Sequence, residues 1–174
     1  MQKGVVRKRR ASQLSEYGKQ LREKQNLKQE YNLRERQFKT YVEKSLANRG
    51  EKSSPELLMQ FLEQRLDSAV FRMGLAKTRA QARQLVSHGH VLVNDRKLNI
   101  PSYSIKQNDV ISVHPSSKDC KYFTEVFLSL KKHEAPSWIS LDKEKGEAKI
   151  VGFSSLEEST PSVELSMVFE FYSR

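Results

Sequence analysis

The chain has 174 residues, of which 30% are charged and 37% hydrophobic, so a modest core is expected. Its formal net charge of +10 favours a polyanionic partner, and the basic excess lies in residues 1–120. The single cysteine, Cys120, excludes an internal disulfide and a cysteine-based zinc site, and we expect it to be buried. No run approaches the roughly 20 apolar residues of a membrane span, and the first residues lack the apolar segment of a secretion signal. A soluble, cytoplasmic protein is expected.

Two polar helices are predicted in the first fifty residues. Ser15 can cap a helix that runs to about Tyr31, and Asn32 suits a left-handed stop. A second helix ending near residues 48–50 is marked by apolar residues at helical spacing: Phe38, Tyr41, Val42 and Leu46. We expect the two helices to pack as a hairpin. Their outer faces carry basic candidates for RNA contact, for which a merely solvated face is the alternative: Arg22, Lys24, Lys28, Arg34, Arg36 and Lys39.

A third helix is predicted to begin at Ser53-Ser54-Pro55, because proline is tolerated in a first helical turn. Its apolar face continues for about 18 residues on the 3.6-residue period, until Gly74 stops it. That face consists of Leu58, Phe61, Leu62, Leu66, Ala69, Val70 and Met73. Arg65 and Arg72, seven residues apart, are expected on one flank of this helix.

A short helix follows, from the predicted capping box of Thr78 and Gln81 to about His88. Its inner side is apolar, whereas Arg79 and Arg83 are expected to stand together outside, near Lys77. Fixed cations beside a positive helix terminus suit phosphate oxygens.

Strand signals replace helical spacing after Gly89. Residues 90–93 and 96–100 alternate around the turn Asn94-Asp95, and Asn108-Asp109 makes a further turn before a third strand at 110–113. A small sheet over two helices is therefore predicted. The C-terminal residues 163–171 also alternate in polarity, which predicts a strand.

Catalytic and metal functions are disfavoured by the residue patterns. The four histidines lack a convincing set of ligand partners, and no nucleophile elbow, zinc-protease motif or glycine-rich phosphate loop is present. Asp67, Asp95 and Asp109 fall in capping or turn contexts, so a catalytic aspartate is not expected. A helix-turn-helix DNA binder is an alternative, since such a reader would contact bases in the major groove.

Three segments resemble a known family. The Arg-Leu-Asp at 65–67, Thr-Arg-x-x-Ala-Arg-Gln-Leu-Val at 78–86 and Val-Asn-x-x-x-x-Asn-Ile-Pro-Ser at 93–102 resemble the S-four RNA-binding module. The flanks at 14–25, 35–38 and 171–174 are similar to those of bacterial-type small-subunit ribosomal protein S-four. Because the module also occurs in RNA-modifying enzymes and in a tyrosine-charging synthetase, the flanks decide for the ribosomal family.

The resemblance implies an α+β architecture: a helical domain at 1–57, an inserted domain at 58–154 whose module spans about 63–120, and a segment at 155–174 that returns to the helical domain. It implies a structural, non-enzymatic protein that binds small-subunit ribosomal RNA at a multi-helix junction of the 5′ domain and nucleates assembly. It also implies neighbouring proteins S-five and S-three and a role in decoding accuracy. A small ribosome-associated RNA-binding stress factor is the alternative. Many family members carry a further N-terminal section, often with metal-binding cysteines, whereas here the similarity starts at residue 1, so no zinc or other cofactor is expected.

A-form RNA presents phosphates and hydroxyls rather than base edges, so the module should recognise backbone and shape. The basic residues expected to bind phosphate are Arg65, Arg72, Lys77, Arg79, Arg83 and Lys97, with Thr78 capping their helix. Polar residues expected to add hydrogen bonds are Gln84, His88, Asn94 and Asn99. Near the path by which messenger RNA enters the subunit, the resemblance places Arg7, Lys8, Arg9 and Arg10. An acidic rim of Glu157, Glu158 and Glu164 is expected to face protein S-five.

Overall fold

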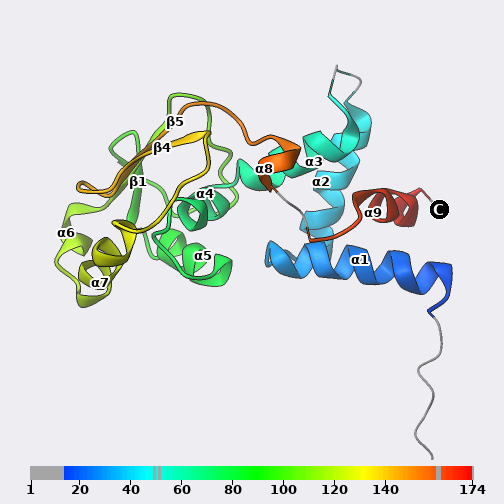
Figure 1. Cartoon of the computed structure of the whole chain (residues 1–174), viewed down its shortest axis with the longest axis horizontal. Helices are drawn as coiled ribbons and strands as arrows, with labels where there is room; N and C mark the ends of the chain where they lie inside the picture. The colour runs from blue at the N-terminus through cyan, green and yellow to red at the C-terminus, as the bar shows by residue number, and fades with distance from the viewer. Residues whose placement is uncertain (1–13, 49, 51, 160–161, 174) are drawn as a thin grey trace, which may run out of the picture.

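The computed structural model describes residues 14–48, 50, 52–159 and 162–173. The described residues form two parts that lie side by side (Figure 1). We call them the helical part and the mixed part, because the second combines helices with an antiparallel sheet. This arrangement confirms the predicted α+β class.

The helical part is assembled from both ends of the chain. It contains α1 (Glu16–Glu30), α2 (Glu35–Ala47), α3 (Ser54–Glu63), α8 (Leu156–Ser159) and α9 (Leu165–Tyr172). The predicted starts are confirmed, because the Ser15 hydroxyl accepts from the Gly18 N–H and Ser53 forms a capping box with Glu56. Asn32 has the predicted left-handed backbone, with φ of 50°.

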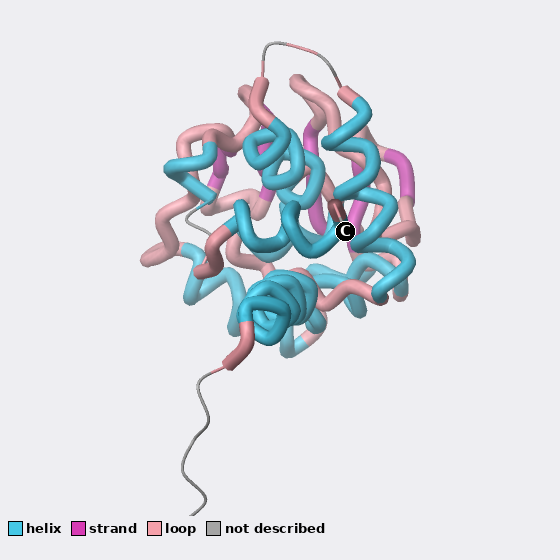
Figure 2. The backbone as a smooth tube through the Cα atoms, turned by 90° about the vertical axis from the view of Figure 1, so that its right-hand side faces the viewer, coloured by secondary structure: helices cyan, strands magenta, loops and turns pink. Residues whose placement is uncertain are grey.

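The expected hairpin of the first two helices is wrong. Helix α1 lies along α9, and α2 lies against α3 and crosses α1 (Figure 1). Viewed from the right-hand side of Figure 1, α1 is seen along its axis below the other helices of this part (Figure 2). Their shared core is built around the buried residues Leu27, Tyr31, Phe38, Leu58 and Val168. Burial against α3 and α9 therefore sets the position of α2.

The predicted C-terminal strand is also wrong, because α9 is a helix. The segment carries two patterns at once, an alternation and a helical stripe of Leu165, Val168, Phe169 and Tyr172. The helical stripe is the one that packs on the core of the helical part. This surface is made of helices, so no neighbouring strand completes the backbone hydrogen bonds that a strand there would need.

The mixed part begins where the predicted 18-residue helix breaks. Helix α3 ends before Gln64, and α4 (Leu66–Arg72) starts after an extended Arg65. Arg65 forms an antiparallel bridge with Ser104, and the backbone N–H of Leu66 donates to the carbonyl of Tyr103. The loop at 101–105 thus replaces helical hydrogen bonds. Arg65 and Arg72 consequently do not share a flank of one helix.

Helix α5 (Arg79–Ser87) follows the predicted stop at Gly74, which has φ of 84°. The Thr78 hydroxyl accepts from the Gln81 N–H as expected, but the Gln81 side chain accepts from Lys77 N–H rather than completing the box at Thr78. Helix α5 ends at its cap His88, and the predicted inner side of Ala82, Leu85 and Val86 is buried.

The sheet has the strand order β2-β1-β3-β5-β4, with every neighbouring pair antiparallel. Strands β1 (Val91–Val93), β2 (Arg96–Lys97) and β3 (Val110–Val113) confirm the predicted hairpin and third strand. Asn94 and Asp95 form its turn with positive φ at both positions. Strands β4 (Ile139–Asp142) and β5 (Glu147–Ile150) extend the sheet beyond the prediction.

Helices α6 (Pro115–Lys118) and α7 (Lys121–Leu130) complete the mixed part. Phe123, Val126 and Leu130 of α7 join the core that α4, α5 and the sheet form. Cys120 caps α7 and is exposed, which corrects the expectation of a buried thiol. The position before α7 places it at the surface because the apolar stripe of that helix begins only at Phe123.

Candidate RNA-binding surface

A buried carboxylate, Glu63, joins the two parts of the molecule. It lies at the end of α3 and is 1% exposed. Arg72 reaches it with Nε at 2.9 Å and Nη2 at 2.8 Å, Arg79 Nη2 lies at 3.2 Å, and the Tyr31 hydroxyl donates at 2.5 Å. Burial, followed by the charge of Glu63, raises the pKa of Tyr31 well above its ordinary value. The hydrogen bonds that Arg72 donates to Glu63 likewise raise the pKa of Arg72.

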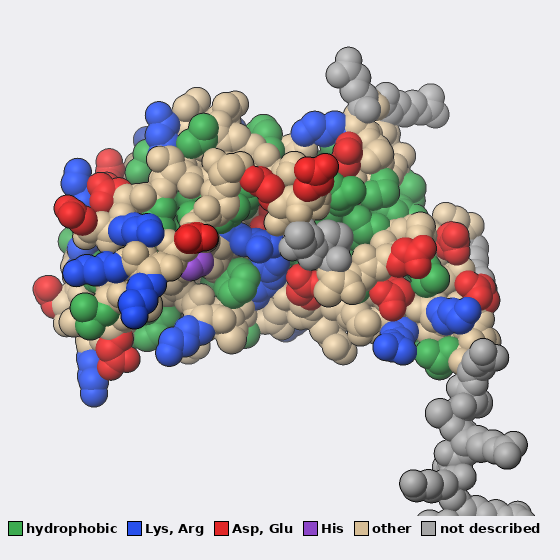
Figure 3. All heavy atoms as spheres, in the orientation of Figure 1, with side chains coloured by type: hydrophobic (Ala, Val, Ile, Leu, Met, Phe, Trp, Pro, Cys, Tyr) green, Lys and Arg blue, Asp and Glu red, His purple; other side chains and the backbone are tan. Residues whose placement is uncertain are grey.

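A second buried carboxylate, that of Asp67 on α4, also helps to join the two parts. Arg65 approaches it with Nε at 2.9 Å and Nη2 at 2.7 Å, and Arg83 with Nη2 at 2.9 Å. Arg65 also donates to the Tyr41 hydroxyl of α2 at 2.8 Å, and Arg83 donates to the carbonyl of Asn32. We call the hydrogen-bonded groups around Glu63 and Asp67 the arginine clasp. It spans the junction, where Figure 3 shows basic side chains between the two parts.

Arginines predicted to stand outside are therefore turned into the junction. The Arg79 guanidinium packs 4.1 Å from the centre of the Tyr31 ring and 4.7 Å from that of Phe71. Its side chain is 9% exposed. The expectation that Arg79 and Arg83 project together into solvent is thus wrong, because two acids buried between the parts attract them inward. Asp67 serves as an ion partner rather than simply as a cap.

The basic residues of α1 and α2 divide into two groups. Lys24 is buried and bonds Glu35 at 2.8 Å, and Lys28 bonds the same carboxylate at 3.1 Å, so neither belongs to a free outer face. Burial acts to raise the pKa of Glu35, but hydrogen bonds from Lys24, Tyr172 and Lys28 outweigh it and lower the pKa to about 2. The candidates that remain exposed are Arg22, Arg34, Arg36 and Lys39.

In the mixed part, the remaining candidates lie on the surface. Those exposed around α5 and the β1–β2 hairpin are Lys77, Thr78, Gln84, His88, Asn94, Lys97 and Asn99. Asn94 is also structural, because its side chain bonds Asp109 and the N–H of Val110 and fixes the turn. These side chains keep donors available to a ligand, in contrast to the clasp.

A hollow at the junction brings together residues from both parts. It is lined by Arg34, Gln37, Arg65, Arg83, Pro101 and Ser102. The Arg34 side chain makes no hydrogen bond or ion pair within the described residues, and Arg34 is the cap of α2, whose first turn has no side-chain cap. The hollow therefore combines guanidinium groups with free N–H groups of a helix start, both of which suit a phosphate.

Sequence reasoning missed the residues that organise this site. Glu63 was available as a signal, since a carboxylate within the apolar stretch of α3 must find partners when buried. Tyr31 and Tyr41, which connect the clasp to α1 and α2, gave no comparable signal. Ser102 lines the hollow because the loop at 101–105 is bridged to Arg65, and Gln37 lines it from α2.

Other predicted positions lie elsewhere. Arg7, Lys8, Arg9 and Arg10 fall outside the described residues. Glu157 and Glu164 are exposed and Glu158 is half-buried, on α8 and at the start of α9. Within the part of the chain that the structure describes, no group of acids, histidines and cysteine is arranged to hold a metal, and no helix has the length and apolarity to cross a membrane.

Comparisons with known proteins agree with this geometry. Residues 64–111 match the S4 domain, and residues 1–63 match the ribosomal protein S4/S9 N-terminal domain. The chain is 46% identical over 166 residues to the small ribosomal subunit protein uS4 of Halothermothrix orenii, covering 95% of this chain and 79% of that protein. For uS4 of Chloroflexus aurantiacus the identity is 45% over 175 residues, covering 99% and 83%, and for that of Aquifex aeolicus 43% over 168 residues, covering 95% and 79%.

The two matched regions define an S4-domain protein with a ribosomal type of helical domain. The chain belongs to the uS4 family of small ribosomal subunit proteins, as its similarity to these relatives over nearly its whole length shows. This family is structural and not enzymatic, in agreement with the sequence analysis.

Proposed function

We propose that the chain is a structural constituent of the small ribosomal subunit that binds ribosomal RNA directly across the junction of its two parts. The observation that carries this proposal is the hollow lined by Arg34 and Arg83, with Gln37 and Ser102 at its sides. Exposed cations lie on both parts as well, at Arg36 and Lys39 on α2 and at Lys77 and Lys97 in the mixed part. A ligand that contacts both sides at once must be extended and anionic, as an RNA junction is.

The arginine clasp has a supporting role in this proposal. Arg65 donates to Asp67, and Arg72 and Arg79 donate to Glu63, so these arginines fix how the two parts are oriented. Arg83 contributes to both, because it binds Asp67 and lines the hollow. A fixed orientation lets the two basic surfaces meet one RNA fold without an ordering cost at binding.

The RNA site is the multi-helix junction of the 5′ domain, and binding there nucleates subunit assembly. We propose that the boundary between the domains lies after Glu63 rather than at the expected residue 57, because Leu58, Met59 and Leu62 of α3 pack in the helical core whereas Leu66 packs in the mixed one. Support for the ribosomal role rather than a stress factor comes from the similarity of both parts to uS4 relatives. Proximity to messenger RNA through Arg7, Lys8, Arg9 and Arg10, and to protein S-three, belongs to the same proposal.

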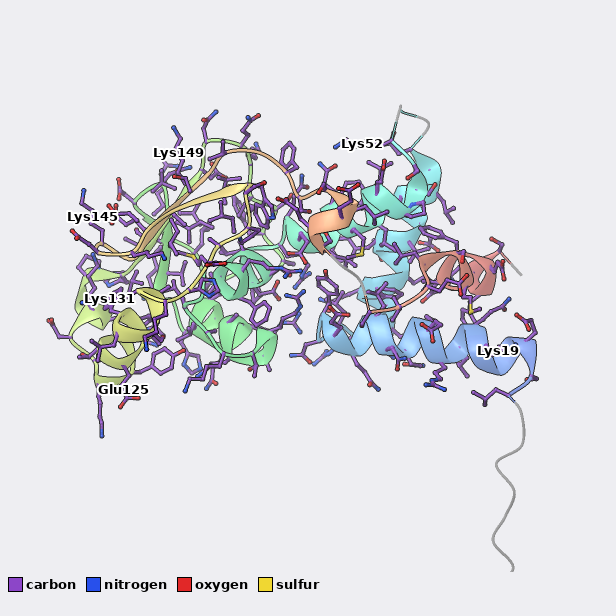
Figure 4. The ribbon with its side chains drawn as sticks, in the orientation of Figure 1. Lys19, Lys52, Glu125, Lys131, Lys145 and Lys149 are labelled. Carbon is purple, nitrogen blue, oxygen red and sulfur yellow. The ribbon has the colours of Figure 1, made fainter. Side chains whose placement is uncertain are left out.

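The direct test compares RNA fragments containing the junction with duplex DNA at several salt concentrations. We expect strong RNA preference, and we expect Arg34→Gln with Arg36→Gln to lower the slope of log affinity against log salt by roughly 0.7 to 0.9 per lost phosphate contact. A matched control is Lys131→Gln with Lys149→Gln, because both lysines are exposed on the mixed part, away from the helical part (Figure 4). Equal slopes in the two variants, or equal binding of DNA, would contradict the proposal.

The acidic residues Glu157, Glu158 and Glu164 are proposed to face protein S-five. Glu157 is exposed on α8, and Glu164 is exposed where α9 begins. Charge reversal at Glu157 and Glu158 should weaken assembly with that neighbour, measured by sedimentation of reconstituted particles, and leave isolated RNA affinity intact. Loss of RNA affinity instead would count against this assignment.

A further inference from the structure

Three histidines and a lysine converge at the edge of the mixed part. His88 caps the end of α5, His90 precedes β1, Lys97 lies on β2, and His114 follows β3. The rings of His88 and His90 have centroids 6.0 Å apart, and the backbone N–H of His114 donates to the carbonyl of His90 at 2.8 Å. Elements distant in sequence thus bring four groups that can carry positive charge to one place.

Gly89 holds Lys97 in this group. Its φ of 73° turns the chain between His88 and His90, and a Cβ there would lie 2.1 Å from Lys97 Cε. The lysine stem therefore packs directly on the glycine backbone. The ammonium group is placed beside the imidazoles by this packing rather than by an acidic partner.

Within the described residues, no carboxylate neutralises the cluster. Burial lowers the pKa of His90, and the nearby charges of His88, Lys97 and His114 lower it further. No acid among the described residues forms an ion pair with any of the four. In the arginine clasp, Glu63 and Asp67 neutralise the arginines. At this edge the basic groups have no such partner, so an external anion would reduce the repulsion between them.

Hydrogen bonds assign different roles to the rings. His114 Nδ1 accepts from the N–H of Ser116 at 3.3 Å, which leaves Nε2 as the ring nitrogen that can donate to an anion. His90 Nδ1 lies 2.8 Å from the hydroxyl of the buried Ser117, which can either donate or accept. His88 is exposed, and its ring makes no hydrogen bond or ion pair within the described residues.

We propose that His88, His90, Lys97 and His114 form a phosphate-binding edge that takes up protons when RNA binds. The inference rests on the proposed function and adds to it a regulation of RNA affinity by pH. Lys97 attracts the phosphate at any physiological pH, and His114 donates a hydrogen bond. His88 and His90 take up the protons. A bound phosphate attracts the charged form of these rings, which the other basic groups of the cluster repel in the free protein.

The test measures affinity of the full chain for the RNA fragment between about pH 5.5 and 7.5, around the ordinary histidine pKa of about 6.5. We expect affinity to rise as pH falls, toward a limit of about tenfold per pH unit for each proton taken up. Calorimetry in buffers of different ionisation enthalpy should show the same proton uptake. Imidazole NMR signals of His88 and His90 should titrate at higher pH once RNA is bound.

His88→Gln with His90→Gln should remove most of this pH dependence while RNA still binds at pH 7.5. His88→Gln alone, at an exposed position, should remove part of it without threatening the fold. The matched control is His133→Gln, because His133 contacts Arg72 and Gly74, outside the cluster. An unchanged pH dependence in the cluster variants, or its equal loss in the control, would overturn the inference. Failure of the wild-type chain to bind RNA at any pH would overturn the proposed function itself.

Discussion

The arginine clasp and the histidine–lysine edge contain residues of the same kind, yet the fold uses them differently. In the clasp, Glu63 and Asp67 are buried and neutralise the arginines around them. At the edge, the side chains whose charge acts on His90 are all basic, and no acid is among them. Basic residues close together in sequence therefore become an internal support or an open anion site according to where the acids are buried. Net charge does not distinguish the two.

The largest effect is expected from removing one charge of the clasp. Glu63→Gln keeps the side chain's shape but leaves Arg72 without its carboxylate and Arg79 with only that of Glu30, 3.9 Å away. Breaking a buried ion pair by removing one partner typically destabilises by about 3–5 kcal/mol, and here the Tyr31 hydroxyl loses its charged acceptor as well. The free energy of unfolding, measured by urea titration, should fall by a similar amount.

A matched variant sharpens this expectation. Glu56→Gln changes the same residue type on the same helix, but Glu56 is exposed and contributes only to the capping box at Ser53. It should lower the free energy of unfolding far less than Glu63→Gln does. If both variants unfold at the same urea concentration, the clasp is not what holds the two parts together.

At the other region, Gly89→Ala should act on both stability and RNA binding. A residue with a Cβ is disfavoured at φ of 73°, by about 1–2 kcal/mol, and the added methyl group would also displace the Lys97 stem. We expect a lower melting temperature and a lower salt slope of RNA affinity. Gly152→Ala is the control, because a Cβ there meets open space. A normal salt slope in Gly89→Ala would show that Lys97 does not contact phosphate.

A smaller effect is expected for Thr78→Ala, which removes the cap of α5 between the two regions. The Thr78 hydroxyl accepts from the N–H of Gln81 at 3.1 Å, and loss of such a cap costs about 1 kcal/mol. Thr78→Ser keeps the acceptor and should restore most of the stability in the same urea titration. Equal losses in both variants would mean that the methyl group, and not the cap, is what matters.

How much of this could be predicted from sequence depends on the range of the interactions. Caps were predicted well, because the Ser15 and Thr78 hydroxyls each accept from a backbone N–H three residues further along the chain. The break at Arg65 was missed because it depends on a bridge to Ser104, thirty-nine positions along the chain. The RNA-binding residues stay predictions, although the structure separates exposed Arg34 from the enclosed Arg79.

The C-terminal segment also shows that local sequence patterns do not determine every element. Its alternation and its helical stripe are both present in the sequence, so period alone could not decide. Packing against α1 and α2 selects the helix, since the ring of Phe171 packs on Tyr17 of α1 and the ring of Tyr172 packs on Phe38 of α2. That the segment returns to these helices was implied by family resemblance and not by any local pattern.

The smallest expected effect concerns Glu35, which neutralises Lys24 and Lys28 as Glu63 neutralises Arg72, but at a half-exposed position. Its pKa is lowered from 4.5 to about 2, so its contribution to stability is complete above pH 4.5 and is lost as pH falls toward 2. Because 47% of the side chain is exposed, solvent screening keeps that contribution small. In urea titrations between pH 5 and 2, Glu35→Gln should lose less stability on acidification than the wild-type chain does. The same acid sensitivity in both proteins would mean that the buried clasp, and not Glu35, sets the loss of stability at low pH. It would also mean that a half-exposed carboxylate adds no measurable stability even when three groups donate to it.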